Sequence, residues 1–395
     1  MKMNKDEFKK KAIDFVQNPK YYNPPYNKKT WGNNWHSICS YRGKLKPAIA
    51  HFLIKEFTEP NDRVLDPMSG VGTIPFEACL QGRKAFGNDL SKMAYIVSNS
   101  KINICKKNDV LKVIDELELY IENGLNDCKK INKLVKKYED FGFNKTLKEY
   151  FDKKTFKEIL LGREFFIYKE NLKPADCIVF SSFMHVLHGN RPYALSRTSH
   201  PLTPYAPKGE YIYKSVIECI KNKVEILYKS SNKEKENIYT EYDLKNYVSG
   251  CMNLGNVLNI SEFYNNIDII ITSPPFVSSL RFYTQNWMRL WLSGWEIDDF
   301  KQAEIDFLES KQKKDLSIYK NIFEEFYKVL KPKGRIILHL GKTDKFDMAK
   351  EISIYCEDLF EIIYIGEENV SKVQKHGIKD KGSTNVHQFM FLEKK

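Results

Sequence analysis

Residues 63–89 read RVLDPMSGVGTIPFEACLQGRKAFGND, and this stretch decides the fold. The run 63–65 predicts a short strand, and the glycine-rich stretch 66–73 predicts a tight turn after it. An apolar helix follows, with Gly82 as its terminating residue. The segment KAFGND predicts a second strand that ends in Asp89. Strand, glycine-rich turn, helix, strand and acid in this order predict half of a Rossmann-like α/β fold.

The glycine-rich turn has a specific mechanical meaning. Gly70 and Gly72 let the backbone turn tightly and approach a ligand closely. The turn lacks the lysine of GxxxxGK[ST] and does not match GxGxxG, so its ligand need not be a nucleotide phosphate. Asp89 ends the second strand, where an acid can accept hydrogen bonds from a ribose. The structural alternative is a plain glycine turn of an α/β protein.

Residues 266–276, NIDIIITSPPF, form a second informative stretch. The β-branched run predicts a buried strand, and two consecutive prolines force its end out of the sheet because they cannot donate ladder hydrogen bonds. The result is a rigid corner with a hydroxyl, two carbonyls and the ring of Phe276. In open α/β sheets ligands bind at the carboxyl ends of strands. The alternative is that Pro-Pro only ends the strand and that Phe276 belongs to the core.

The remaining pattern predicts a mostly parallel twisted sheet with an antiparallel last strand. RIILHLG, EIIYIGE and HQFMFLEK are its later strands. We expect an N-terminal helix and arm over residues 1–35 and an α/β domain formed by 36–105 and 246–395. Residues 106–245 are long, charged and helix-periodic, and they predict a mainly helical insertion. Trp287, Trp291 and Trp295 have helical spacing, which favours core packing over base stacking.

The insertion contains an irregular loop, HGNRPYALSRTSHPLTPYAPKGE. Arginine can bind guanine edges, and serine or threonine can reach phosphates. The alternative is that this proline-rich loop only packs against its own domain. The candidate residues for contact with DNA are Arg191, Arg197, Ser199, His200 and Thr203.

The composition is that of a globular protein with a basic balance. Lys and Arg number 63 against 51 acids, a net charge of +12, which favours a polyanionic partner. Lysines on solvated faces are the alternative explanation. No apolar run reaches the roughly 20 residues that span a membrane. The eight cysteines have no CxxC spacing, and His185 and His188 have no third ligand nearby, so we expect no metal site.

Several motifs in consistent order resemble those of the S-adenosylmethionine-dependent amino-methyltransferases of DNA. The turn 66–73 is similar to their cofactor loop, Asp-Pro-Phe-x-Gly-x-Gly-Thr, with Met68 in place of the usual Phe. Asp89 matches the acid that binds the cofactor ribose. Residues 41–44 are similar to the segment that closes over the methionine end of the cofactor. Ser273–Phe276 matches the catalytic tetrapeptide.

The resemblance implies S-adenosylmethionine as the cofactor and a class I methyltransferase fold over residues 36–105 and about 247–393. The family often has an acid near the cofactor adenine, where this chain has only Asn253 and Asn256 as candidates. The implied catalytic residues are Ser273, Pro274, Pro275 and Phe276. The implied cofactor-binding residues are Tyr41, Arg42, Gly43, Lys44, Asp66, Pro67, Met68, Ser69, Gly70, Gly72, Thr73, Asp89, Leu90, Asn253 and Asn256.

The resemblance also implies a substrate and a mechanism. The cofactor loop precedes the tetrapeptide, which makes the insertion the target-recognition region for double-stranded DNA. The exocyclic amine of a flipped base would attack the sulfonium methyl directly, with Ser273 and the Pro274 carbonyl accepting its N–H groups. A cognate restriction endonuclease is the implied partner, and the expected location is cytoplasmic and nucleoid-associated.

The first residue of the tetrapeptide bears on the target base. Ser-Pro-Pro-Phe is similar to cytosine-N4 enzymes, whereas Asp or Asn at the position of Ser273 is commoner in adenine-N6 enzymes. We therefore expect a cytosine-N4 DNA methyltransferase of a restriction–modification system. The alternatives are an adenine-N6 DNA enzyme, an RNA amino-methyltransferase, and a DNA-binding protein with a degenerate methyltransferase fold.

Overall fold

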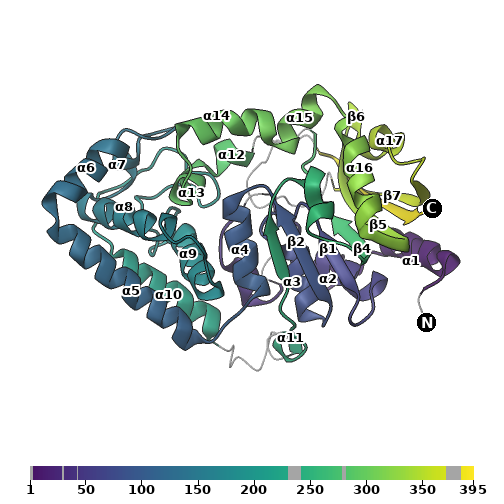
Figure 1. Ribbon diagram of the computed structural model, residues 1–395, viewed down its shortest axis with the longest axis horizontal. Helices are drawn as coiled ribbons and strands as arrows, with labels where there is room; N and C mark the ends of the chain where they lie inside the picture. Colours follow the sequence, from purple (N-terminus) through teal and green to yellow (C-terminus); the bar gives the residue numbers. More distant parts are fainter. Residues whose placement is uncertain (1–2, 29–30, 42, 230–241, 278–281, 371–383) are drawn as a thin grey trace.

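The computed structural model describes residues 3–28, 31–41, 43–229, 242–277, 282–370 and 384–395. It has an α/β part built on one sheet and a helical part beside it (Figure 1). None of the helices in these ranges is long and apolar enough to cross a membrane.

The sheet has the strand order β3-β2-β1-β4-β5-β8-β7, with the short β6 paired to β5. The pairs β3–β2, β2–β1, β1–β4 and β4–β5 are parallel, while β8 is antiparallel to both of its neighbours. This arrangement confirms the predicted Rossmann-like sheet with an antiparallel last strand. The strands are β1 (Arg63–Asp66), β2 (Lys84–Asp89), β3 (Cys251–Leu254), β4 (Ile267–Thr272), β5 (Leu330–Thr343), β6 (Phe346–Asp347), β7 (Phe360–Asn369) and β8 (Val386–Lys394).

Helices cover both faces of the sheet, so its central strands are apolar on both sides. In β4, Ile269 and Ile271 belong to the core under one face, and Ile270 belongs to the core under the other. The first face carries α1 (Lys5–Gln17), α2 (Pro47–Phe57), α3 (Thr73–Leu80) and α4 (Lys92–Ile102). The opposite face carries η3 (Val257–Glu262), α16 (Ile318–Val329) and α17 (Met348–Ser353).

Strand β5 begins earlier than the segment RIILHLG alone predicts. Leu330 already pairs with Ile267 of β4, and the pairing resumes at Arg335 opposite Ile269. The sequence KPKG at 331–334 favours a turn, and the structure accommodates it as an irregularity inside the strand, where Lys333 has a φ of +57°.

Residues 106–229 fold into helices beside the sheet. They are α5 (Lys107–Asn126), α6 (Cys128–Tyr138), α7 (Leu147–Tyr150), α8 (Lys153–Ile167), α9 (Pro174–Val186) and α10 (Val216–Tyr228). The chain then passes through α11 (Tyr242–Lys245) back to the sheet. Two short 3₁₀ helices, η1 (Lys20–Tyr22) and η2 (Asn34–Ser37), lie in the N-terminal arm.

A second segment of the chain packs with these helices. It contains α12 (Phe282–Gln285), α13 (Trp287–Leu292), α14 (Ile297–Asp306) and α15 (Leu308–Lys314), which lie between the helical part and the sheet in Figure 1. Trp287 and Trp291 are fully buried in α13, as the helical spacing predicts, whereas Trp295 follows the end of the helix and is only partly buried. Arg163 of α8 donates hydrogen bonds to the carbonyl oxygens of Trp291 (2.7 Å) and Trp295 (3.2 Å). The helical part is thus assembled from two separate stretches of chain.

Candidate active site

The polar residues of the predicted motifs meet at one edge of the sheet. β1 ends at Asp66, β2 ends at Asp89, and β4 ends at Thr272 immediately before Ser273. Because β1, β2 and β4 are parallel, their carboxyl ends lie side by side. The structure therefore brings the cofactor loop and the Ser-Pro-Pro-Phe corner to the same edge.

The glycine-rich turn closely follows the expected geometry. Gly70 and Gly72 have φ values of +51° and +67°, a region that side chains disfavour. A Cβ on Gly72 would lie 2.7 Å from the Ser98 hydroxyl oxygen and 3.1 Å from the Ser98 Cα. A Cβ on Gly70 would meet the Tyr41 hydroxyl at 3.3 Å. Both glycines are thus required by close approach as well as by backbone conformation.

Asp89 holds this turn to the neighbouring strand. Its two carboxylate oxygens accept hydrogen bonds from the N–H groups of Gly70 (2.8 Å) and Ser91 (2.9 Å). Burial raises the pKa of Asp89 to about 6, against the opposing effect of these N–H donors. Burial also raises the pKa of Asp66 to about 7, although the N–H of Met68 donates to it at 3.3 Å. Both carboxyl groups therefore titrate near neutral pH.

Asn88, which the sequence reasoning missed, connects three segments of the site. Its amide donates to the carbonyl oxygens of Pro67 and Gly255, each at 3.0 Å, and its own oxygen accepts from the Asn253 amide at 2.9 Å. Asn256 accepts from the Leu258 N–H at 3.0 Å and so caps η3. The two candidate adenine contacts thus have structural partners, and their role toward a cofactor stays a prediction.

Ser69 and Thr73, two further predicted cofactor residues, are buried in the turn and at the start of α3. The Ser69 N–H and hydroxyl both donate to the Asn88 carbonyl oxygen, at 2.9 and 3.2 Å. Leu90 is half-buried directly after Asp89. The bonds of Ser69 attach the glycine-rich turn to the end of β2.

The predicted closing segment 41–44 lies over the turn only in part. The Tyr41 ring covers Gly70 and lies 5.3 Å from the Phe282 ring, centroid to centroid. Gly43 has a φ of +82°. The Lys44 ammonium donates to the His36 carbonyl oxygen at 2.8 Å, and burial lowers its pKa. Arg42 lies outside the described residues.

The Ser-Pro-Pro-Phe corner is held by side chains from three other elements. The Ser273 hydroxyl lies 3.0 Å from Nδ1 of His339 on β5. The Pro275 carbonyl oxygen accepts a hydrogen bond from the Gln312 amide at 2.8 Å, and Gln312 in turn accepts one from the Tyr319 hydroxyl at 2.8 Å. Pro274 is buried beside them.

Phe276 lies flat against β5. A Cβ on Gly341 would come within 2.5–3.0 Å of three atoms of the Phe276 ring, so only glycine leaves room for it. The Phe276 ring also lies 5.5 Å from the His339 ring and 6.1 Å from the His387 ring. Sequence reasoning noted the strand LHLG but gave no role to His339 or Gly341, since their contacts depend on the pairing of β4 with β5.

The candidate DNA-contacting residues divide into two groups. Arg191 is exposed, while Arg197 donates to the carbonyl oxygens of Gly209 (2.7 Å) and Glu149 (3.0 Å). The remaining three are Ser199 and Thr203, which are buried, and His200, whose Nδ1 accepts the N–H groups of Leu202 and Thr203. Arg191 is thus the most exposed of the five candidate side chains.

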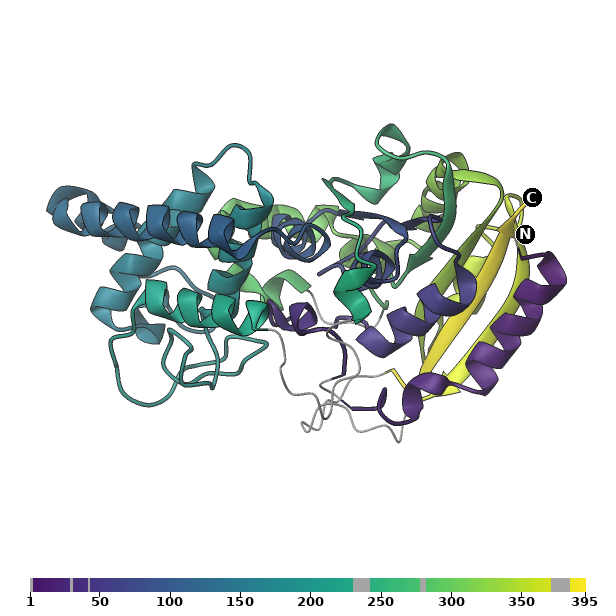
Figure 2. The ribbon, with the colours of Figure 1, turned by 90° about the horizontal axis from the view of Figure 1, so that it is seen from below.

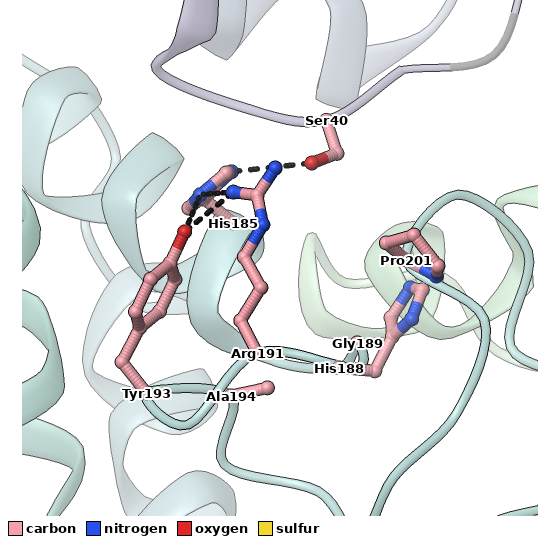
Figure 3. Close-up of a pocket in the computed structure, with 8 residues that line it drawn as sticks. All are labelled: Ser40, His185, His188, Gly189, Arg191, Tyr193, Ala194 and Pro201. Carbon is pink, nitrogen blue, oxygen red and sulfur yellow. Dashed lines mark hydrogen bonds between the residues drawn. The ribbon is translucent and has the colours of Figure 1, made fainter. Parts of the chain in front are cut away.

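Arg191 lines a small hollow between the N-terminal arm and α9 (Figure 3). Its guanidinium donates to Nε2 of His185 at 3.0 Å and to the Tyr193 hydroxyl. Nδ1 of His185 lies 3.3 Å from the Ser40 hydroxyl, and Ser40 immediately precedes Tyr41. Burial lowers the pKa of His185 well below its usual value, so it is neutral here. The network links the loop of the insertion to the segment that covers the glycine turn.

No group of three or more His, Cys, Asp or Glu side chains within the described ranges could hold a metal ion. The cysteines there are all free thiols.

Comparison with known proteins indicates which reaction the residues at the carboxyl ends of β1 and β2 serve. The model of the family described as UPF0020, RMKL-like, methyltransferase domain, matches residues 35–132. That range contains the covering segment, the glycine turn and Asp89. The chain carries a methyltransferase domain. Its cofactor is S-adenosylmethionine, and the buried Asp89 carboxylate beside the tight glycine turn fits such a group, since it can accept hydrogen bonds from a ribose.

One curated relative is the type II methyltransferase M.MjaII of Methanocaldococcus jannaschii. It is 26% identical over 129 residues, which are 31% of this chain and 24% of that protein. The match thus spans about a quarter of the relative's length.

Solved structures give weaker similarity. TrmN from Thermus thermophilus is 12% identical, with a TM-score of 0.33 over 90% of this chain and 50% of that one. An rRNA methylase from Streptococcus thermophilus is 9% identical, with a TM-score of 0.32 over 89% and 97% of the two chains. At these TM-scores the likeness carries no argument, and the fold assignment depends on the strand order.

Proposed function

We propose that this methyltransferase acts on duplex DNA and transfers the methyl group of S-adenosylmethionine to the N4 amine of cytosine. The observation that carries the proposal is the Ser273–Phe276 corner, which lies at the carboxyl end of β4 beside the glycine turn of β1. A methyl donor in that turn and a planar base at the corner would meet at one edge of the sheet.

The corner has groups suited to an exocyclic amine. Such an amine is a poor nucleophile while its lone pair is delocalised into the ring, and acceptors aimed at its N–H groups favour the tetrahedral geometry of the reaction. The Ser273 hydroxyl and the Pro274 carbonyl supply two acceptors on a rigid backbone. Phe276 supplies a ring face for stacking. A base in a duplex must leave the stack to reach this position.

The loop between α9 and α10 supports a nucleic-acid substrate. From residue 188 to residue 214 it has four cations, Arg191, Arg197, Lys208 and Lys214, against the single acid Glu210. Tyr205, Tyr211 and Tyr213 are exposed. Basic and aromatic side chains together are typical of surfaces that contact phosphates and bases.

The position of this loop fits the same substrate. Figure 2 shows the loop on the lower side of the molecule and the end of β8 on the upper side. Strand β8 runs antiparallel to β5, and β5 is parallel to β4, β1 and β2. Since β8 ends on the upper side, the carboxyl ends of these four parallel strands point to the lower side. A duplex could therefore lie across the loop and the catalytic corner together.

The choice of cytosine depends on Ser273. The resemblance of Ser-Pro-Pro-Phe to cytosine-N4 enzymes supports it, and the name type II methyltransferase of the relative from Methanocaldococcus jannaschii is in keeping with a DNA substrate and a partner restriction endonuclease. An adenine amine at the same acceptors is the nearest alternative.

The test is methyl transfer from labelled cofactor to duplex DNA and to RNA, followed by nuclease digestion and mass spectrometry of the nucleosides. We expect N4-methylcytosine in DNA, its loss in Ser273→Ala, and its retention in Ser353→Ala, where the serine bonds only to its own helix. N6-methyladenine alone would refute the cytosine assignment. Label only in RNA would refute the DNA substrate, and no label in either would refute the whole proposal.

A further inference from the structure

A buried histidine lies directly behind the proposed acceptor hydroxyl. His339, on β5, is 5% exposed, and its Nδ1 is 3.0 Å from the Ser273 oxygen. Its other ring nitrogen, Nε2, is buried and has no hydrogen-bond partner in the part of the chain that the structure describes. A histidine in this position controls which way the hydroxyl proton of Ser273 points.

The surroundings of the imidazole favour one of its two neutral forms. The ring lies 5.0 Å from Phe389, 5.5 Å from Phe276 and 4.7 Å from His387, with the His387 ring nearly perpendicular at 85°. An N–H group can make a weak interaction with a ring face, whereas a lone pair that faces a ring has no donor. A proton on Nε2 leaves Nδ1 to accept the hydroxyl proton of Ser273.

We propose that His339 makes Ser273 an acceptor toward the target amine and takes up the proton released by methyl transfer. The inference rests on the proposed amino-methyltransferase function. With its own proton directed to Nδ1, the Ser273 oxygen presents only lone pairs to the base. It then behaves as a carboxylate or an amide oxygen would at that position.

The step balances as follows. The amine nitrogen forms a bond to the methyl carbon while the bond from that carbon to the sulfonium sulfur breaks, and its electron pair stays on sulfur. One amine proton passes to the Ser273 oxygen as the Ser273 proton passes to Nδ1 of His339. The products are a neutral methylated base, a neutral thioether and an imidazolium. His339 later returns the proton to solvent by way of the same hydroxyl.

Few polar groups face His339. Ser273 faces it from the end of β4 and His387 from β8, while the other ring neighbours are the apolar Phe276 and Phe389. No carboxylate is bonded to it among the contacts of the described residues, so the imidazolium would be short-lived. Burial, with a smaller effect of His387, holds the pKa of His339 well below its usual value. The histidine is thus neutral before the reaction. Burial disfavours its imidazolium form, so Nδ1 takes up a proton only from the strongly acidic methylated amine and then releases it readily.

The same geometry bears on base choice. An amine has N–H groups to donate, whereas the carbonyl of uracil or thymine at the equivalent ring position offers only lone pairs. An acceptor-only Ser273 would repel that carbonyl. His339 is therefore a positioning residue that helps to select an amine.

The test compares His339→Asn with the wild-type enzyme in single-turnover methyl transfer at saturating cofactor and DNA. Asparagine can keep a hydrogen bond to Ser273 but cannot take up a proton. We expect a rate constant lower by about 10²-fold, the smaller end of general acid–base effects, with an unchanged dissociation constant for the cofactor. In the double variant Ser273→Ala/His339→Asn the rate should equal that of Ser273→Ala, since His339 acts only through the hydroxyl.

The pH profile separates proton uptake from packing. The wild-type rate constant should fall as acid protonates His339, and His339→Asn should lack that decline. A His339→Asn enzyme with the wild-type rate and profile overturns the inference while the proposed function stands. If the wild-type enzyme labels no amine of a nucleic acid, the proposed function and the role of His339 are both refuted.

A measurement on the unaltered protein guards against misfolding of the variant. In ¹⁵N-histidine spectra, the signal that His339→Gln removes should report a proton on Nε2 and none on Nδ1 at pH 7. If neither substitution leaves a folded protein, the same spectra of the wild-type protein decide, because a proton on Nδ1 in every neutral histidine overturns the inference.

Discussion

The two halves of the site are built by different means. At the β1–β2 edge, the carboxylate of Asp89 binds main-chain N–H groups of Gly70 and Ser91, and the whole arrangement lies within 26 residues of sequence. At the β4–β5 edge, the Ser273 hydroxyl meets the side chain of His339, which is 66 residues away. The core of the proposed cofactor half is a local motif, whereas the proposed catalytic half exists only after two distant strands pair.

This difference determines how each half should respond to substitution. In the cofactor half, the Asp89 carboxylate bonds to backbone N–H groups, so its loss should loosen the turn without moving the groups at the β4–β5 edge. The catalytic half depends on close contact between side chains of different strands, so a small change in volume displaces the reacting groups. We expect substitutions in the catalytic half mainly to lower the rate of methyl transfer. Substitutions in the cofactor half should mainly weaken the affinity for the cofactor.

Gly341→Val should give the largest effect. Its Cβ would fall within 3.0 Å of the Phe276 ring and push that ring from β5. Since a displacement of about 1 Å can reduce a rate by about 10²-fold, we expect a loss of this size in methyl transfer. Cofactor affinity, measured by calorimetry, should stay at the wild-type value. A parallel loss of cofactor affinity would contradict the separation of the two halves.

Asp89→Ala should mainly weaken cofactor binding. The variant loses an acceptor for the ribose and two bonds that hold the turn, and a charged hydrogen bond contributes about 1.5–3 kcal/mol. We expect the cofactor dissociation constant to rise by at least about tenfold, with DNA affinity unchanged. Asp298→Ala removes an exposed acid and is the matched control. Unchanged cofactor affinity in Asp89→Ala would rule out its ribose role.

Cofactor affinity should also depend on pH. Burial raises the pKa of Asp89 to about 6, so its carboxyl group is ionised above that pH and protonated below it. The protonated form has one acceptor fewer, and the affinity should therefore decline several-fold between pH 7 and pH 5. Titrations across this range in Asp89→Ala should show a smaller decline. An equal decline would assign the effect to Asp66, whose pKa burial raises to about 7.

Arg191→Ala should give the smallest effect. Arg191 is exposed, but its guanidinium would have to leave His185 and Tyr193 to contact a phosphate, and the loss of one such contact lowers the slope of log affinity against log salt by about one. We expect a several-fold weaker DNA complex in fluorescence anisotropy at moderate salt. Arg197→Ala is the comparison, because Arg197 bonds to loop carbonyls and should alter loop order instead. A wild-type salt slope in Arg191→Ala would exclude the phosphate contact.

The cofactor half could be predicted from sequence because its main contacts join residues that are close in the chain. Two glycines, an acid after the next strand and the periodicity of residues 63–89 contain most of the information, and the strand order confirms the fold built on them. The Ser-Pro-Pro-Phe corner was also visible, since prolines end a strand whatever surrounds them.

What escaped prediction depends on tertiary pairing. His339 and Gly341 are ordinary strand residues until β5 pairs with β4, and Asn88 gains its bonds to Gly255 and Asn253 only when β3 joins β2. The sequence gives the number of cations in the loop after α9. It does not show which of these side chains bond to carbonyl groups of the loop itself. The packing of residues 282–306 against the helical insertion could not be predicted. Apolar residues at helical spacing indicate burial, but they do not identify the elements that bury them.

The placement of α1 also constrains when the molecule can finish folding. Phe8 lies 5.9 Å from Phe391 in ring-centroid distance, and Arg335 donates to the Met3 carbonyl oxygen at 2.7 Å. At synthesis rates of roughly 5–20 residues per second, about 20–80 seconds separate Phe8 from Phe391 on the ribosome. Until β5, β7 and β8 are made, the main native neighbours of the apolar side of α1 are α2 and the adjoining η1. The helix α1 is therefore among the last elements to be covered, and a chaperone would find part of its apolar side exposed until the strands of the sheet edge are made.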